Sequence, residues 1–73
     1  MGKAGIALRQ VLEKYEIPQN KLAVMMGVSR SNIHRWIYEV GDPSGDNILA
    51  IRDALQKANP EAASAFIELY LNS

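Results

Sequence analysis

The stretch of the chain with the most chemical potential is GVSRSNIHRW, residues 27–36. Two arginines, an asparagine, a histidine and two serines surround Ile33 and Trp36. In the major groove of DNA, arginine can pair bidentately with guanine and asparagine with adenine, while serine adapts to either. No acidic residue, which DNA phosphates would repel, occurs from Asn20 to Tyr38. The residue types therefore predict a surface that reads DNA bases.

A helix over residues 30–38 would separate these polar side chains from the apolar ones. At 100° per residue, one side carries the apolar set, which is Ile33, Trp36, Ile37 and Val40. The opposite side is centred on Ser31 and Arg35, with Arg30 near the helix start and His34 and Tyr38 at its flanks. Such a helix can lie in the major groove with its first residues at base edges.

The rest of the chain reads as further short helices joined by turns. The expected apolar stripes are Leu8, Val11, Leu12 and Tyr15, then Leu22, Ala23 and Met26, and later Ile48, Ile51 and Leu55. They follow the spacing of amphipathic helices, and no segment alternates long enough to be a strand. We therefore predict an all-α fold, a compact bundle of five short helices in one domain, residues 1–73.

Residues that favour helix ends fall between these stripes. Pro18 suits the first position of a second helix and Gly27 its end. Ser29 and Ser44 are favourable N-caps for the third and fourth helices, with Asp46 in the first turn of the fourth.

A tight turn between the second and third helices predicts a helix-turn-helix. Ala23 is small where the two helices cross, Gly27 permits the turn, and Val28 can fill the corner.

Composition limits the other possibilities. The 73 residues hold no cysteine and one histidine, and the net charge is zero. The chain therefore has no thiol and no cluster of cysteine and histidine ligands for a metal. We expect no enzyme, no metal and no cofactor. The neutral total hides an asymmetry, because residues 1–38 carry six bases and two acids and residues 39–73 carry two bases and six acids. Without a membrane span or a secretory signal, we expect a soluble cytoplasmic protein.

Two motifs resemble the helix-turn-helix domains of lambda-type phage repressors and Cro, the XRE family. They are Q-x-x-L-A-x-x-x-G-V-S-x-x-x-I-x-x-W over residues 19–36 and P-S-x-x-x-I-x-x-I-x-x-A-L over residues 43–55. The resemblance covers about residues 6–57 and implies a DNA-binding bundle of four to five helices. It implies phosphate contacts for Gln19 and Tyr38. It implies base or backbone contacts for a further set, which is Arg30, Ser31, Asn32, His34 and Arg35.

The chain departs from the family pattern at two places. Pro18 stands where the family has a capping Ser or Thr, and Asn20 stands where Glu is common. The loop after the third helix carries Glu39, Asp42 and Asp46, whereas a basic residue often precedes Pro-Ser in the family. If this loop approaches a phosphate, its charges oppose DNA binding.

The last helix, at about residues 60–72, follows Asn59 as its cap and Pro60 in its first turn. It carries two apolar stripes, which are Ala62, Phe66, Leu69 and Tyr70, and Ala63, Ile67 and Leu71. One stripe can cover the core of the domain, so the other predicts a partner surface. We expect a homodimer through Phe66, Ile67, Tyr70 and Leu71, with reading helices about 34 Å apart on a near-palindromic operator. The alternative is that both stripes pack inward.

Together these features predict a sequence-specific regulator of transcription that binds double-stranded DNA, a small repressor from a prokaryote or phage. The alternative is a protein-interaction module, or an antitoxin-like partner, that keeps the helix-turn-helix fold. The acid-free helix face favours the first function, and the neutral charge with the acidic loop favours the second.

Overall fold

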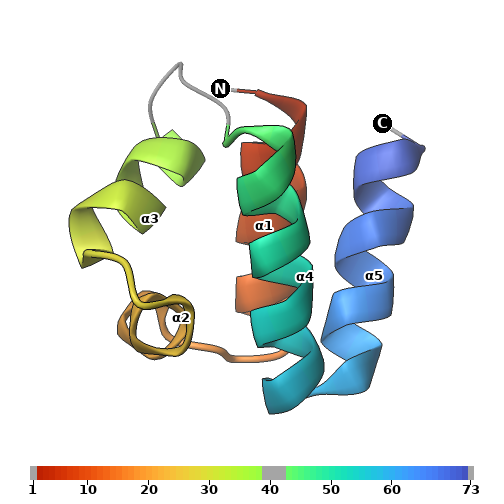
Figure 1. Cartoon of the computed structure of the whole chain (residues 1–73). Helices are drawn as coiled ribbons and strands as arrows, with labels where there is room; N and C mark the ends of the chain where they lie inside the picture. The colour runs from red at the N-terminus through yellow and green to blue at the C-terminus, as the bar shows by residue number, and fades with distance from the viewer. Residues whose placement is uncertain (1, 39–42, 73) are drawn as a thin grey trace.

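The computed structural model describes residues 2–38 and 43–72, which form five α-helices and no strand. The helices are α1 (Lys3–Lys14), α2 (Gln19–Met26), α3 (Arg30–Tyr38), α4 (Gly45–Ala58) and α5 (Pro60–Leu71). Helices α1 and α4 lie in the middle, with α3 on one side and α5 on the other (Figure 1). The predicted all-α bundle of five helices is confirmed. The expected positions of Glu39, Val40 and Asp42 lie outside the described residues.

Side-chain oxygens accept hydrogen bonds from backbone N–H groups at the start of three helices. Ser29 Oγ accepts from the Asn32 N–H at 3.4 Å, and Ser44 Oγ accepts from the Asn47 N–H at the same distance. Asn59 Oδ1 accepts from the N–H of Glu61 at 3.0 Å, and Pro60 occupies the first position of α5. These bonds satisfy backbone donors that have no partner inside the helix. The three predicted caps are confirmed.

The turn between α2 and α3 depends on Gly27, which has a φ of 70°. The N–H of Val28 donates to the Ala23 carbonyl at 3.1 Å, and the N–H of Gly27 donates to that of Val24 at 3.2 Å. This pair of bonds is a Schellman motif, whose left-handed residue is usually glycine. The predicted role of Gly27 is confirmed, and the motif sets the angle at which α3 leaves α2.

The connection from α1 to α2 uses the same motif with a different residue. Glu16 has a φ of 54°, and the N–H of Ile17 donates to the Leu12 carbonyl at 2.9 Å. The sequence analysis did not predict this left-handed glutamate. Pro18 has an extended backbone, with a ψ of 146°, so α2 begins one residue later than predicted and lacks a side-chain cap.

The hydrophobic core joins all five helices. Its largest fully buried side chains are Phe66, Leu8, Leu22, Ile33, Ile37, Ile51, Leu55 and Val11. The predicted stripes of α1, α2 and α4 supply most of these residues, whereas Tyr15, Met26 and Ile48 are only partly buried. No helix in residues 2–38 and 43–72 is both long and apolar enough to cross a membrane.

Gly5 allows α1 and α3 to approach closely. A Cβ at this position would lie 2.0 Å from the backbone oxygen of Trp36. No side chain larger than hydrogen fits there without moving one of the two helices. The orientation of α3 against the bundle therefore depends on a glycine in α1.

Helix α5 buries residues from both of its predicted stripes. Ala62, Ala63 and Phe66 are buried, while Leu69 and Leu71 are exposed. The expectation that Phe66 contacts a second copy is therefore wrong, because this ring is fully covered by the core of its own chain. The exposed leucines of α5 lie in its C-terminal half.

Candidate nucleic-acid interface

Helix α3 divides into a buried apolar side and an exposed polar side. Its buried residues are Ile33, Trp36 and Ile37. Its exposed residues are Arg30, Ser31, His34, Arg35 and Tyr38. The first four exposed side chains line one shallow hollow on the protein surface. The geometry that direct base reading requires, an anchored helix with a free polar face, is therefore present.

The other two predicted site residues lie partly within the fold. Asn32 is half-buried, and its backbone N–H is held by the Ser29 hydroxyl. Gln19 is half-buried as the first residue of α2. It lies at the border of a second hollow, which also includes Tyr38 at the end of α3. The structure thus places Gln19 and Tyr38 on one groove, separate from the hollow on the outer face of α3.

The groove that Gln19 and Tyr38 line has a volume of about 220 Å³. It is formed where α1, the connection to α2, and the end of α3 meet. Its lining residues are Arg9, Leu12, Glu13, Ile17, Pro18, Gln19, Ile37 and Tyr38. We call it the α1–α3 groove. Its polar members come from three different helices.

Aromatic and cationic contacts connect the two hollows. The ring centroids of His34 and Tyr38 lie 4.6 Å apart, with the ring planes tilted by 41°. The guanidinium carbon of Arg9 lies 5.5 Å from the centroid of the Tyr38 ring, within the range of a cation–π interaction. Tyr38 is therefore held by a neighbour on its own helix and by one on α1.

Sequence reasoning missed Arg9 as a residue of this surface. It lies on the first helix, far from residues 27–36 in the chain, and it belongs to no motif. The only signal available was its positive charge in the basic half of the chain.

Charge is distributed unevenly over the described residues. Helices α1 to α3 and their connections carry six bases, which are Lys3, Arg9, Lys14, Lys21, Arg30 and Arg35, against the acids Glu13 and Glu16. Helices α4 and α5 carry Arg52 and Lys57 against Asp46, Asp53, Glu61 and Glu68. The basic side chains of α3 thus belong to the basic part of the molecule, which favours an anionic partner.

Metal chemistry has no support among the described residues. Within residues 2–38 and 43–72, no three His, Cys, Asp or Glu side chains form a group that could hold a metal ion. His34 instead lies on the exposed face of α3, next to Tyr38.

Comparison with known proteins agrees with this geometry. A family model described as helix-turn-helix matches residues 8–58, which include the last seven residues of α1, the α2–α3 motif and α4. No curated protein and no solved structure matches the chain. The family match covers more than half of the chain and both motifs that resemble lambda-type repressors. The chain therefore belongs to the lambda-repressor and Cro-like helix-turn-helix family of DNA-binding domains.

Proposed function

We propose that this protein is a sequence-specific transcriptional regulator, a small cytoplasmic repressor of a prokaryote or phage, that reads the major groove of duplex DNA with α3. The observation that carries the proposal is the division of α3 into a buried apolar side and an exposed side with two arginines and no acid. The two faces anchor the helix and present hydrogen-bond donors at the same time. A groove lined with phosphates and base acceptors matches that chemistry.

The residues would have different tasks. Arg30 and Arg35 would pair with guanine edges, and Ser31 would bond to either base or phosphate, because these side chains share one exposed hollow. Asn32 would reach adenine from the first turn of α3, and His34 would contact the backbone beside them. Gln19 and Tyr38, which border the α1–α3 groove, would contact phosphates and fix the position of α3.

Binding to DNA as a function of salt tests the proposal. Purified protein is titrated into a random duplex at salt concentrations from about 50 to 200 mM, and affinity is measured by fluorescence anisotropy. Each phosphate that the protein neutralises should contribute about −0.9 to the slope of log K against log salt. Selection from random duplexes then tests sequence specificity, with a preferred site about a thousand times or more tighter than random DNA.

The alternative function is a protein-interaction module or antitoxin-like partner that uses the acidic helices. The observation that favours it is the excess of acids on α4 and α5. The absence of measurable binding to duplex DNA at about 50 mM salt would support this alternative and contradict the DNA-reading role of α3.

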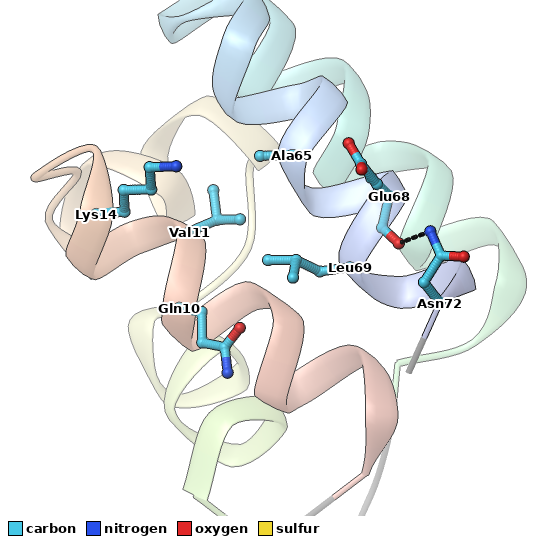
Figure 2. A pocket seen from close by; sticks show the side chains of 7 residues that line it. All are labelled: Gln10, Val11, Lys14, Ala65, Glu68, Leu69 and Asn72. Carbon is cyan, nitrogen blue, oxygen red and sulfur yellow. Dashed lines mark hydrogen bonds between the residues drawn. The ribbon is translucent and has the colours of Figure 1, made fainter.

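We also propose that the protein forms a homodimer through a groove between α1 and α5. This groove of about 530 Å³ is lined by Gln10, Val11, Lys14, Ala65, Glu68, Leu69 and Asn72. Figure 2 shows Val11 and Leu69 facing each other across it, with Lys14 on α1 and the carboxylate of Glu68 on α5. Of the residues first predicted for this contact, Ile67 and Tyr70 are half-buried and Leu71 is 68% exposed at the end of the same helix.

Charge complementarity favours a second copy as the occupant of this groove. Lys14 and Glu68 line the same surface, and no ion pair joins them within the described chain. In a twofold dimer the same patch meets itself, so Lys14 of one copy can lie near Glu68 of the other. Helices α3 and α5 lie on opposite sides of α1 and α4, so an interface at α5 separates the two α3 helices of a dimer (Figure 1). For both α3 helices to meet one duplex, their exposed sides must face the same way along the twofold axis. The expected centre-to-centre spacing of the half-sites is then about 34 Å.

A charge exchange tests this dimer. Lys14→Glu alone places like charges in the interface and should shift the molecular mass in sedimentation towards that of the 8.1 kDa monomer. Adding Glu68→Lys restores the complementary charges, so the double variant should recover the dimer. A wild-type protein that stays monomeric at about 100 μM would contradict the dimer and leave the reading role of α3 unaffected.

A further inference from the structure

We propose that Arg9 of α1, which lies outside the two helices of the helix-turn-helix motif, binds a phosphate of the DNA backbone. The inference rests on the proposed reading role of α3. The Arg9 contact would attach the protein to DNA at a second point, on a helix other than α3. This contact would not depend on the DNA sequence. A phosphate contact of this kind positions the protein on the duplex and does not discriminate between bases.

The first observation is that Arg9 is fixed against the proposed DNA-binding surface. Its guanidinium carbon lies 5.5 Å from the centroid of the Tyr38 ring, which also lies next to the ring of His34. Arg9 also lines the α1–α3 groove together with Gln19. A phosphate that contacts Gln19 or Tyr38 therefore comes close to the guanidinium group.

The second observation is that Arg9 retains hydrogen-bonding capacity. Its Nε donates to Glu13 Oε1 at 3.2 Å, and this is the only hydrogen bond of its side chain to a residue that the structure describes. The two terminal nitrogens remain available, and the side chain is 47% exposed. The planar donors of a guanidinium group suit a phosphate, which can accept two parallel bonds.

The carboxylate of Glu13 competes with a DNA phosphate for the guanidinium group of Arg9. This carboxylate lines the same groove and neutralises Arg9 when DNA is absent. An ion pair between exposed side chains is weak, so a phosphate can take the place of the carboxylate or share the guanidinium with it. The carboxylate nevertheless repels an approaching phosphate. Removing its charge should therefore strengthen DNA binding.

The experiment compares Arg9→Gln with the wild-type protein on a selected duplex and on random DNA. The loss of one phosphate contact should make the slope of log K against log salt less steep by about 0.9. The ratio of wild-type to variant affinity should then fall about threefold between 50 and 200 mM salt. The same change is expected on both duplexes, because the contact carries no sequence information. Arg9→Lys, which keeps the charge, should retain the wild-type slope.

Arg52→Gln provides the matched control. Arg52 lies on α4, is 45% exposed and pairs with Asp53 at 2.9 Å, so it resembles Arg9 in exposure and pairing. Its replacement should leave the salt slope unchanged. Glu13→Gln should tighten binding to both duplexes about twofold or more, with the larger gain at low salt. Thermal unfolding at the wild-type midpoint would show that Arg9→Gln is folded.

The outcomes separate the two proposals. If the wild-type protein binds DNA and Arg9→Gln keeps its salt slope, the role of Arg9 is wrong and the reading role of α3 stands. Glu13→Gln binding that equals wild type would contradict the competitor role of the carboxylate. Failure of the wild-type protein to bind any duplex would overturn the proposed function and the Arg9 contact with it.

Discussion

Helices α3 and α5 lie on opposite sides of the bundle (Figure 1). Both are attached to it by a buried apolar side, but their exposed sides differ in chemistry. Each buries one large aromatic side chain, Trp36 in α3 and Phe66 in α5. The outer side of α3 is polar and basic, with Arg30 and Arg35. The C-terminal half of α5 exposes Leu69 and Leu71 beside Glu68, and Leu71 is the more exposed of the two leucines.

The comparison shows that burial of one side of a helix leaves the chemistry of its other side open. Helix α3 packs against α1 through the gap left by Gly5, and α5, whose buried residues include Ala62 and Ala63, packs against α1 and α4. The missing side chain of Gly5 permits the close approach of α3 to α1. The outer sides therefore suit different partners in the proposed function, an anionic polymer for α3 and a second copy of the chain for α5.

The largest expected effect concerns the inner side of α5. Phe66→Ala removes a fully buried ring and should lower the free energy of unfolding by about 3–5 kcal/mol. For a chain this short, that loss is comparable to the total stability. Urea unfolding followed by circular dichroism measures it. A loss below about 1 kcal/mol would mean that Phe66 is exposed in solution and that it can belong to the proposed partner surface of α5.

The next effect tests how α3 is attached. Gly5→Ala places a methyl group against the backbone oxygen of Trp36 and should lower the free energy of unfolding by about 1–3 kcal/mol. Gly45→Ala is the matched control, because a Cβ at Gly45 meets no atom within 4 Å. This control should be neutral or stabilise the protein by about 0.5 kcal/mol. Equal stability of the two variants would show that α3 does not lie this close to α1.

The outer side of α3 should affect binding without affecting stability. Arg35→Ala should weaken binding to a selected duplex by about 1–3 kcal/mol, because it removes the proposed base contact. Arg52→Ala on α4 should change that affinity little. Both affinities are measured by anisotropy, alongside thermal unfolding. If Arg35→Ala lowered the unfolding midpoint as strongly as it lowered affinity, the side chain would belong to the fold and not to the reading surface.

The smallest effect on stability is expected at the outer side of α5. Leu71→Ser should change the free energy of unfolding of the monomer by less than about 0.5 kcal/mol, because the side chain is 68% exposed. It should nevertheless weaken the proposed dimer, because we expect the interface to extend from the groove between α1 and α5 to Leu71. The weakening is measured as a higher dissociation constant in sedimentation. Leu49→Ser, on α4 with 50% exposure, controls for the loss of an exposed leucine. A similar dissociation constant for the two variants would remove Leu71 from the interface.

Much of this fold follows from local patterns that can be read along the chain. Ser29, Ser44 and Asn59 begin helices because their side-chain oxygens accept from backbone N–H groups two or three residues away. Gly27 ends α2 for an equally local reason, since its φ of 70° is costly for residues with a Cβ. The exposure of Arg35 and its neighbours follows from the helical period and the apolar residues opposite them.

The remaining features depend on residues that are distant in the chain, so no local pattern could specify them. The close approach of Gly5 to Trp36 and the contact of Arg9 with Tyr38 exist only because α1 lies against α3. The burial of Phe66 had the same origin, because both stripes of α5 are apolar and packing against α1 and α4 decided which side turned inward. Periodicity thus specified which sides of the helices could be buried, and the relative placement of the helices decided which of them were.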